Sequence, residues 1–336
     1  MIPPISILMP FRDAEATLPE CLESIRRQTF GDYELLAVDD GSQDGSVALV
    51  EAAARADARV RLLQPGRVGL VAALNYGLAQ ARGALLARMD ADDLMRPERL
   101  AAQRAALEQD PSLALVACQV ELFPAEQVRE GYREYLRWQN SCITPQQIAG
   151  QLYVESPLAH PSVMLRREVL EQLGGYAAGP FPEDYELWLR MHQAGMRMAK
   201  LPQVLLDWRE RPDRTSRVDP RYAREAFDRL RARFLAQEPR LHSGRALVFW
   251  GAGRKTRLRA RLLIDQGFCP IAWIDIDPRK IGQRVWGLPV QPPAWLDQRP
   301  RPFVLVYVTN HGAREYIDSL LAPLGYRLGE DYLGVG

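Results

Sequence analysis

The feature that most constrains the fold is a regular alternation of short apolar runs with longer segments of helical period. Apolar runs predict strands at residues 5–9, 33–38, 60–63 and 84–89. Apolar residues three or four positions apart predict helices at 14–28, 43–56 and 69–81, the second capped by Ser42 or Asp44. Parallel strands need a crossover between them, so this order is typical of a parallel sheet covered by helices. The sequence therefore predicts an α/β fold.

The rest of the chain contains a less regular stretch and then a second α/β pattern. Strands are predicted at 113–120 and 163–166, and helices at 185–194 and 222–237. Arg245 opens a new strand and helix in ALVFWGAGRKTR, and the strands IAWIDID and FVLVYVTN follow. We expect a first domain at 1–217, a helical linker at 218–242 and a smaller Rossmann-like α/β domain at 243–336.

Composition excludes several functional classes. The 336 residues contain 43 Lys and Arg against 42 Asp and Glu, so no net field attracts nucleic acid, and no nucleic-acid partner is expected. No apolar stretch of about 18 residues predicts a membrane span, and MIPPISILMPF lacks the features of a signal peptide. Cys21, Cys118, Cys142 and Cys269 are scattered and predict buried thiols in a reducing compartment. We expect a cytoplasmic protein.

Two groups of carboxylates directly follow predicted strands. Asp39 and Asp40 end YELLAVDD, and Asp90, Asp92 and Asp93 follow ALLARM. Ligand sites in open α/β sheets lie beyond these strand ends. Aspartates also cap helices and start turns, and Asp93 could cap the segment MRPERL. Three adjacent acids, however, raise one another's pKa unless a cation intervenes, and carboxylates with a substrate diphosphate suit Mg²⁺ or Mn²⁺.

A third acidic group lies far downstream in PFPEDYELWLR, with Glu183, Asp184 and Glu186. Glu183 and Asp184 precede the predicted helix, where they could simply cap it or interact with its dipole. A carboxylate brought from elsewhere in the chain is also what an acceptor hydroxyl needs as a general base. The sequence leaves both interpretations open.

Several segments, in this order, resemble the family-2 glycosyltransferases, nucleotide-sugar enzymes with the GT-A fold. The resemblance covers roughly residues 1–210 and rests on ISILMPFRDAEATLPECLESIRRQTF, YELLAVDDGSQDGS, GLVAALNYGLAQARG with ALLARMDADD, LAHPSVMLRREVLEQLGGY, and PEDYELWLR. It implies a GT-A type nucleotide-sugar-binding fold for the first domain.

The resemblance also implies roles for individual residues. The residues implied to bind the donor nucleotide are Pro10, Arg12, Asp39, Asp40, Asn75, Arg88 and Asp90. Asp92, with Asp90, would bind Mn²⁺ or Mg²⁺. Asp184 would be the general base, with Glu183 as the alternative, and His160 would lie on the acceptor side. An ordinary ion pair of Arg88 with a neighbouring acid, and a structural hydrogen-bonding role for His160, remain the alternatives.

The implied function is an inverting, divalent-metal-dependent glycosyltransferase. It would move a sugar from a nucleotide-sugar, expected to be UDP-linked, to a glycan or lipid-linked acceptor in cell-surface polysaccharide or lipopolysaccharide synthesis. The segment YAREAFDRLRARFLAQ is basic and amphipathic. Packing on its own protein is the favoured interpretation, and peripheral association with the inner face of the cell membrane stays open. The sequence does not predict the oligomeric state.

The last domain carries an incomplete dinucleotide fingerprint. Gly251 and Gly253 stand between a predicted strand and helix, and Asp275 ends the next strand, but Thr256 occupies the third glycine position. The stretch resembles nucleotide-sugar-binding domains attached to some sugar acyltransferases, which implies a binding or structural module. Two other functions remain open: a nucleotide-binding oxidoreductase acting through this domain, and a non-catalytic sugar-nucleotide-binding protein.

Overall fold

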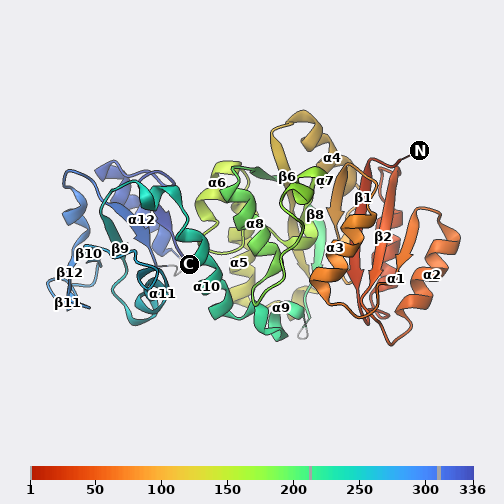
Figure 1. The fold of residues 1–336 in the computed structure, drawn as a ribbon, viewed down its shortest axis with the longest axis horizontal. Helices are drawn as coiled ribbons and strands as arrows, with labels where there is room; N and C mark the ends of the chain where they lie inside the picture. Colours follow the sequence, from red (N-terminus) through yellow and green to blue (C-terminus); the bar gives the residue numbers. More distant parts are fainter. Residues whose placement is uncertain (1, 212–213, 309–311) are drawn as a thin grey trace. The chain divides into compact units, whose positions relative to one another are not determined.

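The structure is a computed structural model that describes residues 2–211, 214–308 and 312–336. The chain forms two compact units, each with its own sheet (Figure 1). The first unit comprises Met1–Ile148 and Pro157–Asp219, and the second comprises Ala149–Ser156 and Pro220–Gly336. Helix α10 (Arg224–Leu235), which lies in the predicted linker, is part of the second unit.

The first unit is built on an eight-stranded sheet of order β3-β2-β1-β4-β7-β6-β8-β5. The strands are β1 (Ile5–Phe11), β2 (Tyr33–Asp39), β3 (Val60–Leu63), β4 (Leu85–Arg88), β5 (Leu94–Met95), β6 (Leu113–Phe123), β7 (Met164–Arg166) and β8 (Arg197–Arg209). The four strands β3, β2, β1 and β4 are parallel, as predicted. The sheet as a whole is mixed, because β7 is antiparallel to both β4 and β6.

Strand β1 is longer than predicted, so Pro10 lies in a strand and not in the loop after it. Its pairing with β2 continues to Phe11 opposite Asp39, whereas its pairing with β4 ends at Leu8 opposite Arg88. Leu8 faces β4, because its carbonyl accepts a hydrogen bond from Met89 N–H. The backbone of Pro10, two residues later, faces the same neighbouring strand as that of Leu8. Pro10 lies beyond the last residue that pairs with β4, so its missing N–H removes no hydrogen bond between β1 and β4.

Helices surround this sheet (Figure 1). They are α1 (Leu18–Arg26), α2 (Ser46–Ala56), α3 (Leu70–Gln80), α4 (Arg99–Gln109), α5 (Glu130–Ser141), α6 (Pro145–Gln151), α7 (Arg167–Gln172), α8 (Glu183–Gln193) and α9 (Thr215–Val218), with 3₁₀ turns η1 (Ala125–Gln127) and η2 (His160–Ser162). The predicted cap of α2 is wrong, because Gly45 occupies the N-cap. The Ser42 hydroxyl instead accepts a hydrogen bond from Asp13 N–H, which ties the loops after β1 and β2 together.

A buried carboxylate joins the strands at the opposite end of the sheet from the acidic groups. Glu34, on β2, is 1% exposed. It accepts hydrogen bonds from the Ser6 hydroxyl at 2.7 Å, from Arg61 at 2.8 Å, and from both the backbone N–H and the side chain of Arg82 at 2.8 Å. These contacts connect β1, β2 and β3 to the segment before β4. They fix the register of the parallel strands whose other ends carry the acids.

The second unit has a six-stranded sheet of order β11-β12-β10-β9-β13-β14. The strands are β9 (Leu247–Trp250), β10 (Ala272–Ile274), β11 (Arg284–Val285), β12 (Leu288–Gln291), β13 (Phe303–Val306) and β14 (Tyr332–Gly334). Besides α10, the helices are α11 (Arg254–Ile264) and α12 (Ala313–Leu321), with 3₁₀ turns η3 (Pro220–Tyr222), η4 (Pro239–His242), η5 (Pro293–Leu296) and η6 (Ala322–Leu324). All strands except β11 run parallel. The predicted strand FVLVYVTN is shorter, and its last two residues lie outside the described part.

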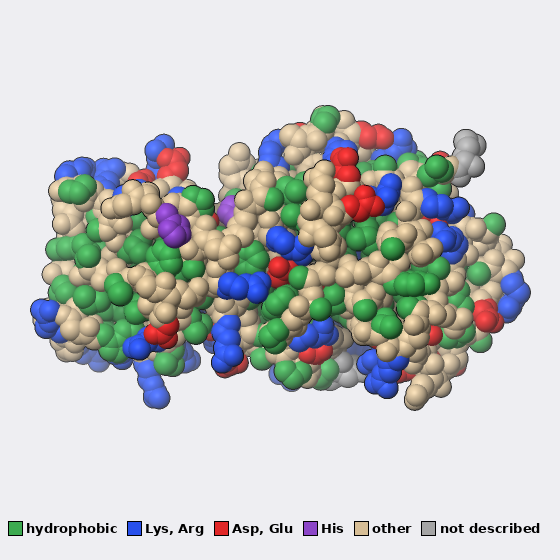
Figure 2. Space-filling view, viewed as in Figure 1, with side chains coloured by type: hydrophobic (Ala, Val, Ile, Leu, Met, Phe, Trp, Pro, Cys, Tyr) green, Lys and Arg blue, Asp and Glu red, His purple; other side chains and the backbone are tan. Residues whose placement is uncertain are grey.

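The burial of individual side chains bears on two further expectations, which concern the four cysteines and helix α10. Cys269 is exposed, whereas Cys21, Cys118 and Cys142 are buried as predicted. Helix α10 buries Leu230 and Phe234 and also Arg231, which is 4% exposed, and it packs against α11 of its own unit. Over the face of the first unit seen in Figure 2, basic and acidic side chains are interspersed. Among the described residues, no helix has the length and apolar character needed to cross a bilayer.

Candidate active site

The acidic group after β4 is a compact cluster. Asp90, Asp92 and Asp93 each offer a carboxylate oxygen, and these oxygens all lie within 4.8 Å of one another. Asp93 is 1% exposed, and its Oδ1 accepts a hydrogen bond of 2.8 Å from Arg209 N–H on β8. Its Oδ2 has no hydrogen-bond partner within the described part of the chain. Asp93 therefore does not cap the next helix, which begins after Glu98, and the capping interpretation is wrong.

The electrostatics of this cluster are unfavourable without a cation. Burial, followed by the charges of Asp92 and Asp90, raises the pKa of Asp93 well above its ordinary value. Burial and the charge of Asp90 also raise the pKa of Asp92. The charge of Arg214 opposes both pKa shifts but does not cancel them. Three convergent carboxylates and a buried oxygen without a partner fit a hard divalent cation such as Mg²⁺ or Mn²⁺.

Arg88, the last residue of β4, lies between this cluster and the second acidic group. It is 4% exposed, and its guanidinium forms an ion pair with the Asp90 carboxylate. Burial has the largest single effect on the pKa of Arg88 and would lower it, but the charge and hydrogen bond of Asp90, together with Tyr176 and Glu183, raise the pKa overall. Glu183 also contributes to that rise, so Arg88 faces both groups. The sequence left two roles open for Arg88, a contact with the nucleotide and an ion pair with a neighbouring acid. The structure contains the ion pair.

The second acidic group lies at the start of α8. Glu183 and Asp184 are the first two residues of that helix, so the expectation that they precede it is wrong. Glu183 is 2% exposed, whereas Asp184 keeps part of its surface accessible. Burial, followed by the neighbouring charge of Glu183, raises the pKa of Asp184 to about 7. At this pKa both protonation states are populated near neutral pH, as suits a general base.

His160 lies against these acids. Its Nδ1 is 3.7 Å from Glu183 Oε1, and its Nε2 is 3.1 Å from the Tyr176 hydroxyl. Burial, followed by the charge of Arg88, lowers the pKa of His160, so the ring is neutral near pH 7. A buried, neutral, hydrogen-bonded histidine agrees with the structural role that the sequence offered as the alternative to an acceptor contact.

Asn75 forms two hydrogen bonds with the backbone of Tyr176. Its side-chain amide donates to Tyr176 C=O at 2.9 Å and accepts from Tyr176 N–H at 2.8 Å. The pair holds α3 against the segment that leads into α8. Because the Tyr176 hydroxyl in turn lies 3.1 Å from His160 Nε2, Asn75 fixes the backbone of the residue that contacts His160.

Asp39, Asp40 and Arg12 gather at the carboxyl ends of β1 and β2. Asp39 Oδ1 accepts a hydrogen bond of 2.9 Å from Ser42 N–H. Asp40 Oδ1 accepts from the N–H groups of Val68 at 2.8 Å and Gly69 at 2.6 Å, which fixes the loop before α3. Arg12 Nη1 lies 3.7 Å from Asp40 Oδ2. Since β1 lies between β2 and β4, these residues share one edge of the sheet with the Asp90 cluster.

The sequence interpretation missed Arg214, an arginine near the cluster whose side chain is 10% exposed. Arg214 is held by the Tyr132 hydroxyl at 3.1 Å and Glu210 at 3.4 Å, and its guanidinium lies 4.2 Å from the centre of the Trp208 ring. Burial would lower its pKa, but the charges of Tyr132 and the three aspartates raise it. The feature of the sequence that could have indicated this residue is the high density of arginines in WRERPDRTSR, which starts at the end of β8.

Comparison with known proteins decides the family. Residues 6–174 match the family described as Glycosyl transferase family 2. The chain belongs to glycosyltransferase family 2. It is 33% identical over 216 residues to EpsE of Bacillus subtilis, named as a glycosyltransferase, an alignment covering 63% of this chain and 74% of EpsE. It is 31% identical to the amylovoran biosynthesis glycosyltransferase AmsE of Erwinia amylovora, covering 60% and 74% of the two chains.

Other comparisons agree. The O-antigen biosynthesis glycosyltransferase WbnJ of Escherichia coli is 29% identical, with 61% of this chain and 79% of WbnJ covered. The crystal structure of S. aureus TarS 1–349 in complex with UDP-GlcNAc superimposes with a TM-score of 0.55 at 18% identity, covering 69% of this chain and 66% of TarS 1–349. The family-2 assignment and the GT-A fold predicted for the first unit are confirmed, and the protein is a glycosyltransferase.

Proposed function

We propose that this glycosyltransferase is an inverting, divalent-metal-dependent enzyme. It moves a sugar from a nucleotide-sugar, UDP-linked, to a glycan or lipid-linked acceptor in the synthesis of a cell-surface polysaccharide or lipopolysaccharide. The observation that carries the proposal is the Asp90, Asp92 and Asp93 cluster, separated from Asp184 by the buried Arg88. The names of AmsE and WbnJ support the product class, and the UDP-GlcNAc of the TarS structure makes a uridine donor the first to test.

In this proposal Asp92 and Asp90 hold Mn²⁺ or Mg²⁺. When bound, the cation supplies Lewis-acid stabilisation of the departing diphosphate. Asp93 keeps the group rigid through its bond to Arg209 N–H. Arg88 orients Asp90 through their ion pair. On the nucleoside side, Asp39 contacts the base, with Pro10 and Arg12 bordering the nucleotide and Asp40 holding the loop before α3 in place.

Asp184 is the general base in this mechanism. Its accessible surface and its pKa of about 7 support it over Glu183, which is 2% exposed and lies against His160. Asp184 removes the proton from the acceptor hydroxyl as that oxygen attacks the anomeric carbon opposite the leaving diphosphate. A single displacement of this kind inverts the configuration. His160 and Asn75 shape the acceptor side through Tyr176.

The test is calorimetric binding of UDP, with and without Mn²⁺, to the wild-type chain, to Asp92→Ala and to the control Asp32→Ala. Asp32 is an exposed residue before β2, so its loss removes an equal charge outside the cluster. We expect binding to require both Mn²⁺ and Asp92 and to be unchanged in the control. Metal-independent binding that Asp92→Ala leaves unchanged would contradict the proposal.

A further inference from the structure

The second unit contains a cavity of about 220 Å³, apart from the residues assigned to sugar transfer. Its lining includes Gly253, Asp275, Ile276, Lys280 and Tyr316. All of these follow the carboxyl ends of β9, β10 and β13. The cavity therefore lies at one edge of the sheet.

The strand order explains why a cavity forms there. From β9 the chain passes through α11 to β10 on one side, and later returns to place β13 on the other side of β9. The connections leaving β9 and β13 therefore diverge, which makes this a topological switch point. In open parallel sheets, ligands bind at such points beyond the carboxyl ends of the strands.

The floor of the cavity is a turn that brings backbone close to a ligand. Gly251 has a φ of 112°, and a Cβ at this position would lie 2.8 Å from Val308 Cγ2, so only glycine fits. Thr256 occupies the position of the third fingerprint glycine, and its hydroxyl lies 2.7 Å from both Gly251 C=O and Gly253 C=O. The threonine closes the turn, which offsets the incomplete glycine pattern.

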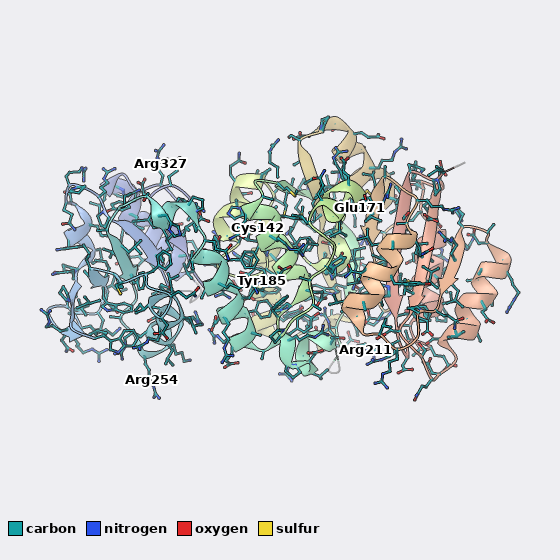
Figure 3. All side chains as sticks on the ribbon, viewed as in Figure 1. Cys142, Glu171, Tyr185, Arg211, Arg254 and Arg327 are labelled. Carbon is teal, nitrogen blue, oxygen red and sulfur yellow. The ribbon has the colours of Figure 1, made fainter. Side chains whose placement is uncertain are left out.

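This floor favours an anion. Helix α11 begins at Arg254 directly after the turn, and within the described part of the chain no side chain caps its first N–H groups. The same end of the helix carries the positive end of the helix dipole. Lys280 adds a cation, with its Nζ 3.0 Å from Asp275 Oδ2. Arg254 itself points away from the ribbon into solvent (Figure 3).

The walls favour a ring and a hydroxyl-bearing group. Ile276 and Tyr316 line the cavity, and because each is 50% exposed, their side chains are accessible to a ring placed between them. Asp275 is 6% exposed and is held in place by the N–H groups of Ala252 at 2.9 Å and Asp277 at 3.0 Å. An anchored carboxylate of this kind can still accept a hydrogen bond from a sugar hydroxyl.

We propose that this cavity binds a nucleoside monophosphate. The phosphate lies at Gly253 and the start of α11, the ribose hydroxyls at Asp275 and Lys280, and the base between Ile276 and Tyr316. The volume of about 220 Å³ is below the ~300–1,000 Å³ typical of ligand pockets, which favours one nucleotide over a dinucleotide. The site is independent of the transfer reaction, and it gives the second unit a binding role instead of hydride transfer.

The decisive variant is Gly253→Val in the full chain. Gly253 has φ −72° and ψ 159°, a conformation that valine adopts readily, and a Cβ there meets only Thr256 Oγ1, at 3.6 Å. The side chain therefore fills the floor of the cavity without backbone strain. Gly131→Val is the matched control, because Gly131 lies in α5 with nothing within 4 Å of a Cβ. Tyr316→Ala removes one wall at an exposed position and serves if Gly253→Val unfolds at a lower temperature.

The measurement is calorimetric titration in EDTA with AMP, GMP, CMP and UMP, and with inorganic phosphate and NAD as comparisons. We expect at least one nucleoside monophosphate to bind the wild-type chain, Gly131→Val and Asp92→Ala equally. Gly253→Val and Tyr316→Ala should each weaken binding about ten-fold or more. Asp92→Ala removes only the proposed metal site. Binding of a nucleoside monophosphate to this variant therefore tests the cavity separately from the proposed transfer reaction.

Three results would overturn the inference. The first is no binding of any of the four nucleotides at millimolar concentration. The second is binding that Gly253→Val and Tyr316→Ala both leave unchanged. The third is tighter binding of inorganic phosphate or NAD than of every nucleoside monophosphate, which would assign the cavity to a simple anion or to a dinucleotide.

Discussion

Glu34 offers a quantitative test of how the sheet beneath the active site is held together. Burial alone would raise the pKa of Glu34, but hydrogen bonds from Ser6, Arg82 and Arg61 outweigh it and lower the pKa from 4.5 to about 2. A shift of this size corresponds to at most about 3 kcal/mol of stability. Because the Arg82 side chain is 52% exposed, water screens part of this, and we expect about 2 kcal/mol.

The perturbation is Glu34→Gln, which keeps the shape of the side chain and resembles its protonated form. The ionised carboxylate stabilises the fold fully above pH 4.5, and its contribution disappears as the pH falls from 4.5 through about 2. The free-energy difference between wild type and Glu34→Gln should therefore be about 2 kcal/mol at pH 7 and should shrink steadily below pH 4.5. Urea-dependent hydrogen exchange of peptides from β1 and β2 measures this difference within the first unit alone.

Glu23→Gln is the matched control. Hydrogen bonds from Arg26 and Arg27 also lower the pKa of Glu23 to about 2, but this glutamate is on the surface of α1. Exposed ion pairs contribute little, so we expect no measurable change at any pH. A difference for Glu34→Gln that stays constant from pH 7 to pH 3, or an equal loss in Glu23→Gln, would refute the reasoning.

Two further predictions concern the acceptor side. With an Asp184 pKa of about 7, the rate of UDP release from a UDP-sugar should fall about ten-fold per pH unit below pH 7. Asp184→Asn should lower this rate about 10²–10⁴-fold and remove its pH dependence. A normal rate in Asp184→Asn, with a loss in Glu183→Gln, would assign the base to Glu183 instead. Asn75→Ala removes two hydrogen bonds to Tyr176 and should cost about 1–3 kcal/mol in urea unfolding, whereas an unchanged midpoint would show that the amide does not position this segment.

The parallel half of the sheet was predictable because its signals are local. Strands β1 to β4 are short, mostly apolar runs, and the helices between them keep an apolar stripe. Strand β8 escaped prediction because Pro202 interrupts it and its burial does not alternate. Its pairing with β6 contains register shifts, so no simple period marks it. Long-range pairing, not local pattern, defines this strand.

The same distinction applies to the site. The Asp90, Asp92 and Asp93 cluster is contiguous in sequence, so its proximity could be predicted. Arg214 lies more than a hundred residues later, and its approach to the cluster depends on the position of β8. The role of Asn75 likewise depends on a contact 101 residues away. Family resemblance marks which residues matter, but only the tertiary contacts show that Asn75 acts on Tyr176.

The acidic cluster also links stability to function. Arg88 and Arg214 lie beside the three aspartates, yet the pKa values of Asp92 and Asp93 stay raised and Asp93 Oδ2 has no partner in the described chain. The folded protein thus keeps a repulsion that its own cations leave unrelieved, which is a stability cost at neutral pH. Asp92→Ala should therefore lose metal-dependent UDP binding while unfolding at the same temperature or a higher one. A structural capping role for these aspartates would give the reverse: lower stability with UDP binding intact.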